Sequence, residues 1–403
     1  MNLFTKFILL AFLVPVPAAA QETQHDLAAS ASQITQQSYL VDTHIDVPYR
    51  LKEQWSDVSH RTDGGDFDYE RARQGGLDLP FMSIYTPAES EDDGTAWQLA
   101  NELIDSVEAL AARAPKRFAL ARNTQEAENA RQRGLIGLAM GMENGAPIDG
   151  ELENLAYFKQ RGISYITLAH SKSNHISDSS YDPEKKWNGL SPFGREVVAE
   201  MNRLGIMIDI SHVSDEAFYD VLELSRAPVI ASHSSARHFT PGFERNMSDD
   251  MIRALAANGG VIQINFGSSF LTSEARAWYE RLSELREAWA ESTGLPMEGD
   301  HASEWVATYR EQNPMPYATL SDVVDHFDHV IGLVGVEHVG IGSDFDGVGD
   351  SLPEGIKDVS QYPALVEEFL RRGYETEDIE AILGGNLMRV WADVERASAA
   401  NRD

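Results

Sequence analysis

The chain has 403 residues, with 33 Lys and Arg against 64 Asp and Glu, so its formal net charge is −31, and it contains no cysteine. A chain this acidic repels a phosphate backbone, and no local cluster of basic residues offsets the repulsion, so we expect no nucleic-acid partner. The absence of cysteine excludes disulfides, iron–sulfur clusters and a thiol nucleophile. Any bound metal must therefore be held by His, Asp and Glu, which suit borderline or hard divalent ions.

The first twenty residues have the pattern of an export signal. Lys6 supplies a positive start, residues 7–16 form an apolar run, and Ala18 and Ala20 occupy the positions that signal peptidase prefers. An uncleaved membrane anchor is the alternative, but the apolar run is shorter than the roughly 20 residues that span a bilayer. We therefore expect residues 1–20 to be removed and residues 21–403 to be exported, periplasmic or secreted, without a stable membrane anchor.

Eight short apolar runs along the chain predict eight β-strands. They are residues 39–43, 79–85, 135–142, 165–169, 206–211, 228–232, 261–266 and 338–343. The runs are continuously apolar rather than alternating with polar residues, which indicates a sheet covered on both faces. Eight is also the number of parallel strands that closes a (β/α)8 barrel.

Amphipathic segments between most of these runs predict helices at residues 95–113, 193–204, 214–224 and 248–257. The last of them opens with a Ser-Asp-Asp cap. Because strands and helices alternate, we predict an α/β fold consisting of one (β/α)8 TIM-type barrel domain over residues 21–403. The segment of about residues 267–320 is too long for a plain crossover, so we expect a helical insertion there, before the last strand.

Polar or ionisable residues stand at the C-terminal ends of seven of the eight predicted strands. They are His44 and Asp46, Tyr85, Glu143, His170, His212, His233 and Asp344. In a (β/α)8 barrel these ends converge on the mouth where active sites are built. So many polar groups aimed at one point need either a cation or a tight hydrogen-bonding network.

The spacing of these residues suits two metal ions. His44 and Asp46 are two residues apart on an extended segment, so both side chains lie on one face and can bind one ion. His212 and His233 each follow an apolar run on neighbouring strands and form a natural pair for a second ion. Glu143 ends a strand that lies between the His44–Asp46 pair and the His212–His233 pair, so its two oxygens can bridge both ions. Two divalent ions about 3.5–4 Å apart can share a water and lower its pKa.

Each of these residues also has an ordinary structural interpretation. A single His at a strand end is more often a hydrogen-bonded rim residue than a ligand, Glu143 is also suited to capping a following helix, and His-x-Asp alone is a weak motif. The coincidence of five such residues is what favours a dinuclear site. His326 and His329, on a predicted amphipathic helix, are interpreted as surface or packing residues.

Several segments of the chain resemble those of a known family in both order and spacing. They are VDTHIDVPYR, GGLDLPFMSIYTP, AMGMENG, YITLAHS, IDISHVSD, VIASHSSAR, ERNMSDD and GIGSDFDGV. The family is that of the membrane dipeptidases (renal dipeptidases), zinc peptidases within the broader amidohydrolase-like barrels. The resemblance extends from about Val41 to the GGNLMRVW segment near residue 391.

The resemblance implies a dinuclear zinc metallo-dipeptidase, a hydrolase that cleaves the peptide bond of dipeptides through a metal-bridging hydroxide. Two Zn²⁺ per chain are implied, although other divalent metals are compatible with the same ligand types. Their implied ligands are His44, Asp46 and Glu143 for one ion, and Glu143, His212 and His233 for the other.

The resemblance also implies the residues that contact the substrate. Asp344 is implied as the acid/base group and His170 as a contact near the scissile carbonyl. Arg245 aligns with a residue that binds the C-terminal carboxylate, and Tyr85 aligns with a pocket residue. For Arg245 the structural alternative is a salt bridge to a neighbouring acid such as Glu244 or Asp249.

Two properties of the animal members cannot be carried over. They are lipid-anchored and disulfide-linked, whereas this sequence has neither cysteine nor an anchoring tail, so a homodimer is left open but a covalent dimer is not expected. Two other functions stay as alternatives. One is a dinuclear hydrolase of N-acyl-amino acids or β-lactams, and the other is an exported solute-binding or metal-storing protein. Metal storage alone requires neither His170 nor Asp344.

Overall fold

The computed structural model describes residues 18–297 and 299–400. The predicted export signal falls mainly on residues 1–17, outside the described residues, and stays a prediction. Within the described ranges, no helix has both the length and the apolar character needed to cross a membrane.

Among the described residues, nine strands form the sheet. They are β1 (Leu40–Ile45), β2 (Leu77–Tyr85), β3 (Phe118–Leu120), β4 (Ile136–Glu143), β5 (Ile163–Thr167), β6 (Met207–Asp209), β7 (Ile230–Ala231), β8 (Val261–Ile264) and β9 (Val339–Ile341). Eight of them follow the order β1-β2-β4-β5-β6-β7-β8-β9, and every neighbouring pair is parallel. The predicted (β/α)8 architecture is therefore confirmed.

Backbone hydrogen bonds join the first strand to the chain just after the last one. The Asp46 N–H donates to the carbonyl of Phe345 at 2.9 Å, and the Asp344 N–H donates to the carbonyl of His44 at 3.1 Å. These two bonds nearly close the barrel. They also bring Asp46 and Asp344, which are far apart in the sequence, to the same end of the sheet.

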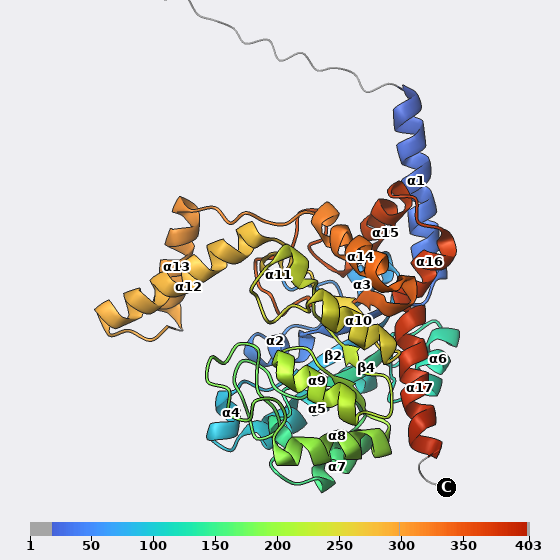
Figure 1. The fold of residues 1–403 in the computed structure, drawn as a ribbon. Coiled ribbons are helices and arrows are strands. Elements are labelled where there is room, and N and C mark those ends of the chain that lie inside the picture. The colour runs from blue at the N-terminus through green and yellow to red at the C-terminus, as the bar shows by residue number, and fades with distance from the viewer. Residues whose placement is uncertain (1–17, 298, 401–403) are drawn as a thin grey trace, which may run out of the picture.

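Helices lie between and around the strands (Figure 1). They are α1 (Ala18–Gln37), α2 (Val47–Glu53), α3 (Tyr69–Gly75), α4 (Glu89–Asp92), α5 (Ala96–Arg113), α6 (Thr124–Gln132), α7 (Glu153–Arg161), α8 (Pro192–Leu204), α9 (Asp215–Leu224), α10 (Asp249–Ala257), α11 (Ser268–Leu271), α12 (Ser273–Thr293), α13 (Asp300–Gln312), α14 (Leu320–Val334), α15 (Tyr362–Arg371), α16 (Thr376–Glu380) and α17 (Asn386–Ala400). Short helical turns occur at Ala146–Ile148, Arg237–Phe239, Val336–His338, Val359–Gln361 and Ala381–Gly385.

Serine caps fix the start of several crossover helices. Ser191, Ser214 and Ser248 precede α8, α9 and α10, and each side chain accepts a hydrogen bond from the backbone N–H three residues later. Such a bond satisfies one of the free N–H groups at a helix start. The Ser-Asp-Asp cap predicted before α10 is present in this form.

β3 was not predicted. Its three residues pair in parallel with Ile136–Leu138 of β4, and the strand is not part of the barrel path. A three-residue strand flanked by Arg117 and Arg122 carries too little apolar pattern to stand out in the sequence.

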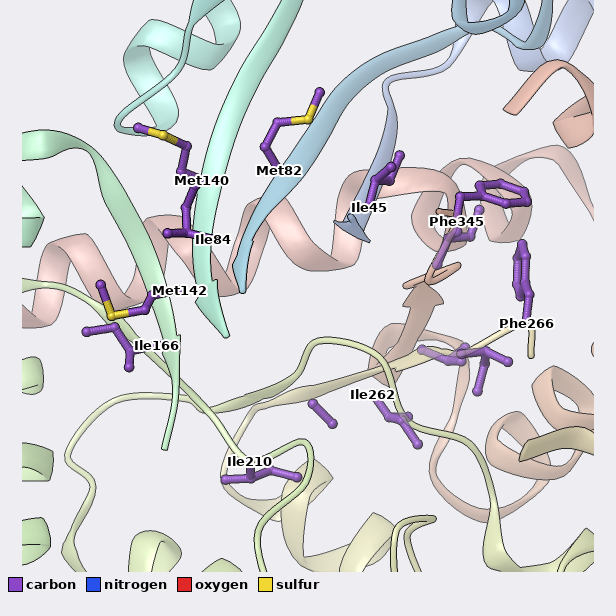
Figure 2. Close-up of a cluster of buried hydrophobic side chains, with 14 of the residues drawn as sticks. Ile45, Met82, Ile84, Met140, Met142, Ile166, Ile210, Ile262, Phe266 and Phe345 are labelled. Atoms are coloured by element: carbon purple, nitrogen blue, oxygen red, sulfur yellow. The ribbon is translucent and has the colours of Figure 1, made fainter. Parts of the chain in front are cut away.

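In the part of the chain that the structure describes, two clusters of buried side chains make up the core. The larger cluster fills the layer between strands and helices, and Figure 2 shows part of it, including Met82, Met140 and Ile166. The second cluster takes residues from seven of the barrel strands and is completed by side chains of α17. Within it, the ring of Phe81 lies 5.7 Å from that of Tyr165 and 5.2 Å from that of Trp391.

The helical insertion predicted before the last strand is present as α12 and α13, which project from the barrel as a hairpin (Figure 1). Aromatic contacts hold the two helices together, since the ring of Trp289 on α12 lies 5.8 Å from that of Trp305 on α13, and the ring of Trp278 on α12 lies 5.9 Å from that of Tyr309 on α13. Trp278 also donates a hydrogen bond from its indole to the carbonyl of Asn313 at 3.0 Å. Only Ala275 and Leu282 of α12 and Ala302 of α13 are buried among their described residues.

Candidate active site

The structure brings the polar residues at the strand ends into one cluster. Within this cluster, three groups have ligand atoms that all lie within 4.8 Å of one another, namely His44–Glu143–His233, Glu143–His170–His212 and His44–Asp46–Asp344. All five predicted metal ligands are therefore together, and His170 and Asp344 lie with them. The groups overlap without dividing as the resemblance implies, because His233 lies with His44 and His170 lies with His212.

Glu143, the last residue of β4, stands at the centre of the cluster. Its Oε2 is 3.3 Å from His44 Nε2, and its Oε1 is 3.1 Å from His212 Nε2 and 3.2 Å from His233 Nε2. The two oxygens thus face different histidines. On the first side, Asp46 Oδ2 also lies 3.4 Å from His44 Nε2. Each oxygen of the Glu143 carboxylate therefore has imidazole nitrogens of its own within 3.3 Å.

Tyr165 of β5 fixes the orientation of His44. Its hydroxyl donates to the carbonyl of Thr43 at 2.9 Å and lies 2.8 Å from His44 Nδ1, so it accepts a hydrogen bond from Nδ1–H. His44 Nε2 is therefore directed toward the carboxylates. Gly141 of β4 makes this contact possible, because a side chain at residue 141 would occupy the space of the Tyr165 ring.

A second relay fixes His233. The Ser232 hydroxyl donates to Asp209 Oδ2 at 2.6 Å and lies 2.8 Å from His233 Nδ1, so it accepts from that nitrogen. Asp209 is buried and is the acceptor for several further donors, among them the backbone N–H of Ser211 at 3.0 Å. Nε2 of His233 is thereby left with its lone pair facing Glu143. Hydrogen bonds of this kind behind a ligating histidine set its tautomer.

The geometry around His212 fits a divalent cation. Its Nε2 lies 2.8 Å from His233 Nε2 and accepts a hydrogen bond from Arg245 Nη2 at 3.0 Å. Two nitrogen lone pairs and a carboxylate oxygen then converge with no proton between them. Burial first, and the charge of Arg245 with it, holds the pKa of both His212 and His233 well below the usual value. Neutral imidazole is the form that binds metal.

The surroundings of Glu143 Oε2, which faces His44, also favour a positive charge. Burial alone would lower the pKa of His44, but Tyr165, Glu143 and Asp46 raise it well above its usual value. His44 Nε2 is nevertheless buried without a hydrogen-bond partner among the described residues. Burial would likewise raise the pKa of Glu143, yet His44 and His170 hold it well below the usual range. A metal ion satisfies the same demand for positive charge as the proton, so the residues present fit a metal.

The backbone is constrained at the site. His212, Asp344 and Asp346 have φ angles of +70°, +64° and +66°, in the left-handed region that residues other than glycine rarely adopt. Each follows directly or closely after the end of a strand. Such conformations cluster at functional sites, where the surrounding structure holds a side chain in one direction.

Asp344 is held by Asn265, whose side-chain amide donates to its Oδ2 at 2.7 Å. Burial first, and then Asp46, raises the pKa of Asp344 to about 7. Gly347 follows closely, and a Cβ there would collide with the carboxylates of both Asp344 and Asp46. Sequence reasoning missed Asn265, although it stands at the end of the seventh predicted strand, the one strand to which no site residue was assigned.

A cavity of about 880 Å³ opens onto the cluster. The predicted residues that line it are Asp46, Tyr85, Glu143, His170, His212 and Asp344. Tyr85 packs the edge of its ring against His170, with 4.9 Å between ring centres. The insertion also contributes to the wall, through Arg276, Tyr279, Ser283 and Glu287 of α12. These four residues were not predicted to belong to the site from the sequence.

Arg245 lies behind the cavity rather than on its wall. Its guanidinium is buried and donates to Ser234 Oγ at 2.7 Å, to the carbonyl of His233 at 2.7 Å and to His212. The alternative salt bridge to Glu244 is not formed, because Glu244 pairs with Lys185 at 3.2 Å. The predicted contact of Arg245 with a substrate carboxylate stays a prediction.

The two histidines interpreted as surface or packing residues are both part of α14. His326 is fully buried, and its Nδ1 accepts a hydrogen bond from the Ala236 N–H while its Nε2 donates to the carbonyl of Leu271, both at 3.0 Å. His329 is partly buried and lies 2.8 Å from Asp249 Oδ1.

Comparison with known proteins assigns the chain to a family. The family model described as Membrane dipeptidase (Peptidase family M19) matches residues 28–403. The chain is 32% identical over 366 residues to Dipeptidase 3 of Mus musculus, covering 89% of this chain and 64% of the mouse protein. It is also 32% identical over 385 residues to Uncharacterized dipeptidase C965.12 of Schizosaccharomyces pombe, covering 90% of this chain and 82% of the yeast protein.

A solved structure of another protein has a similar fold. The crystal structure of the probable dipeptidase PvdM from Pseudomonas aeruginosa matches 93% of this chain and 99% of its own, with a TM-score of 0.80 and 26% sequence identity. The chain therefore belongs to the membrane dipeptidase family, peptidase family M19, which is a family of metallo-dipeptidases.

Proposed function

We propose that the protein hydrolyses the peptide bond of dipeptides at a site that holds two divalent ions, with zinc as the expected metal. The observation that carries the proposal is the position of Glu143, which presents one oxygen to His44 and the other to His212 and His233. The residues that would hold the metals are His44, Asp46, Glu143, His212 and His233. When bound, the two ions would supply Lewis acidity, polarising the scissile carbonyl and lowering the pKa of a shared water.

The chain's own residues would position the substrate and move the proton. His170 lines the cavity beside Glu143, with 3.5 Å between its Nε2 and Oε1, and is placed to contact the scissile carbonyl. Asp344 lines the same cavity and is oriented by Asn265. We assign it to take the proton of the attacking water and to return it to the leaving amine.

Arg245 has a defined way to become available to a substrate carboxylate. The Nε2 lone pair of His212 cannot serve both a metal and Arg245, so in the loaded site Arg245 has one donor free. Its planar guanidinium then suits a carboxylate. We keep this residue as the proposed contact for the C-terminal carboxylate of the dipeptide.

The experiment is a hydrolysis panel on protein of known metal content. Zinc-loaded protein should carry about two ions per chain and cleave a set of dipeptides, and a chelator should abolish the cleavage. N-acyl-amino acids and a β-lactam belong in the panel, because activity confined to them would replace the dipeptidase proposal. Two bound ions without hydrolysis of any amide would favour a metal-storing protein instead.

We also propose that the protein is exported and cleaved after Ala20. The support is the sequence of residues 1–20, with Lys6 before an apolar run and alanine at residues 18 and 20. The mass of the mature protein, isolated from the periplasm or the medium, is the test. A chain that begins at Gln21 agrees with the proposal, and one that retains Met1 in a membrane fraction contradicts it.

A further inference from the structure

Helix α12 forms one wall of the active-site cavity. Arg276, Tyr279, Ser283 and Glu287 all line it, at steps of three and four residues, so a single face of the helix is turned toward the cavity. This face belongs to the insertion between β8 and β9, a segment that contributes no residue to the cluster of proposed metal ligands. Its side chains are therefore free to determine which substrates fit.

Arg276 is held in a fixed position on this wall. Its guanidinium carbon lies 3.9 Å from the centre of the Phe243 ring, and its Nε donates to Glu280 Oε1 at 2.8 Å. A guanidinium stacked on a ring keeps the edge that carries its terminal N–H groups available for a carboxylate. Among the described residues, no hydrogen bond or ion pair engages Nη1 or Nη2 of Arg276.

The other arginines near the cavity are already engaged. Arg50 also lines it, but its Nε lies 2.9 Å from Asp346 Oδ2 and its Nη2 donates to the carbonyl of Phe67. Arg245 lies behind the wall, and the one donor that metal binding at His212 would release is already assigned to the terminal carboxylate of the substrate. Among the described residues that line the cavity, Arg276 is thus the cation whose terminal nitrogens are available to a ligand.

Aromatic rings connect the metal cluster to Arg276. The ring of Tyr181 lies 5.9 Å from that of His212 and 5.9 Å from that of Phe243, over which Arg276 is stacked. An extended dipeptide covers only about 7 Å of backbone. The peptide bond is placed at the cluster and the terminal carboxylate is assigned to Arg245, so the part of the substrate left to meet Arg276 is a side-chain group.

The position of Arg276 near Arg245 also indicates which residue of the dipeptide it contacts. Phe243 is two residues before Arg245, which the proposed function assigns to the C-terminal carboxylate. We infer that Arg276 binds the side-chain carboxylate of the C-terminal residue, so that the enzyme favours dipeptides ending in Glu or Asp. This inference rests on the proposed function and adds a substrate class to it.

The test compares Ala-Glu with Ala-Gln, which has the same shape without the charge. In zinc-loaded wild-type protein, kcat/KM should be higher for Ala-Glu. The Arg276→Gln variant should lose roughly tenfold or more on Ala-Glu, mainly through KM, because a charge-assisted hydrogen bond of about 1.5–3 kcal/mol is removed. The loss on Ala-Gln should be much smaller.

Two further variants separate recognition from a structural effect. Arg281→Gln is the matched control, since Arg281 lies on the same helix, pairs with Glu284 at 3.2 Å and does not line the cavity. It should leave both substrates unchanged. Arg276→Glu should shift the preference toward Ala-Lys, an exchange that loss of structure alone cannot produce.

The outcomes distinguish this inference from the function on which it rests. Wild-type protein that cleaves no dipeptide of the panel overturns both, whereas protein that cleaves other dipeptides but not Ala-Glu overturns the role of Arg276 alone. Cleavage of both peptides with no preference for Ala-Glu, or with equal losses in Arg276→Gln, overturns the role of Arg276 and leaves the dipeptidase proposal in place.

Discussion

Two hydrogen-bonded residues behind the cluster determine how its histidines are presented. Tyr165 receives the Nδ1 proton of His44, and Ser232 receives that of His233. Neither residue would itself touch a metal or a substrate. Their effect is to direct Nε2 of each imidazole toward Glu143.

Removal of the Tyr165 hydroxyl should therefore weaken metal binding. Tyr165→Phe keeps the ring that packs on Phe81 but leaves His44 Nδ1 without its acceptor, so metal affinity should fall by about tenfold to a hundredfold. Titration against a competing chelator measures the change. Tyr157→Phe is the control, because its hydroxyl donates to Asn101 at 2.6 Å on α5. Equal affinity in wild-type protein and Tyr165→Phe would contradict the role given to Tyr165.

Sequence could predict the residues at strand ends but not those behind them. His44, Glu143, His212 and His233 stand out because a polar residue directly after an apolar run is uncommon. Asp209 lies inside such a run, and nothing in IMIDIS indicates that its carboxylate receives the Ser232 hydroxyl. Contacts of this kind depend on which strands become neighbours, and that is settled only when the barrel forms.

At the level of elements, regular patterns were predicted well and short or shifted elements poorly. α5, α8, α9 and α10 lie within a residue or so of their predicted ranges, since amphipathic periodicity over several turns is a strong signal. β5 begins at Ile163, two residues before the predicted run, and β3 was missed. The inserted hairpin, and its effect on the pocket, could be predicted from the length and position of the segment, whereas the side chains that line the cavity could not, because a crossover's length does not reveal which helix face turns inward.

One buried side chain of α14, His326, is hydrogen-bonded to two neighbouring segments. Its protonation makes the stability of the folded protein depend on pH. His326 is neutral, with a lone pair on Nδ1 facing the Ala236 N–H, so protonation would place two N–H groups against each other. Burial lowers its pKa from 6.5 to about 4. The unfolded chain therefore takes up this proton first, and stability is lost as pH falls from about 6.5 toward 4, by about 3 kcal/mol at most.

The variant His326→Gln should show a smaller loss of stability over the same pH range. Its amide can supply both a donor and an acceptor but does not titrate. Thermal unfolding between pH 7.5 and pH 4.5 should show the difference in Tm between wild type and variant shrinking as pH falls. His301→Gln, at an exposed position on α13, is the control. A constant difference across the series would rule out His326 as the source.

For the molecule as a whole, the charge of −31 includes three carboxylates, Asp46, Glu143 and Asp344, that are buried together at one end of the barrel. Without a cation they repel one another across a region of low dielectric. Because the chain has no disulfide, cation binding is one of the few cross-links available between distant strands.

Metal removal should consequently destabilise the entire protein. A ligand present at 1,000 times its Kd adds about 4 kcal/mol to the stability of the folded state, so chelation should lower Tm and added zinc should restore it. Scanning calorimetry with parallel metal analysis measures the effect. Glu143→Gln, which lacks the central charge, should show a much smaller shift. An unchanged Tm in wild-type protein shown to be metal-free would contradict this coupling.

The barrel is completed by residues from the two ends of the chain. Asp46 bonds to Phe345, and Trp391 of α17 packs against Phe81 within the second core cluster. A chain emerging from the ribosome has no partner for β1 on that side, and no cover for Phe81, until its last helix has been made. Contacts so far apart in sequence are formed slowly. We therefore expect the barrel to close only after the segments that contain Phe345 and Trp391 have been synthesised.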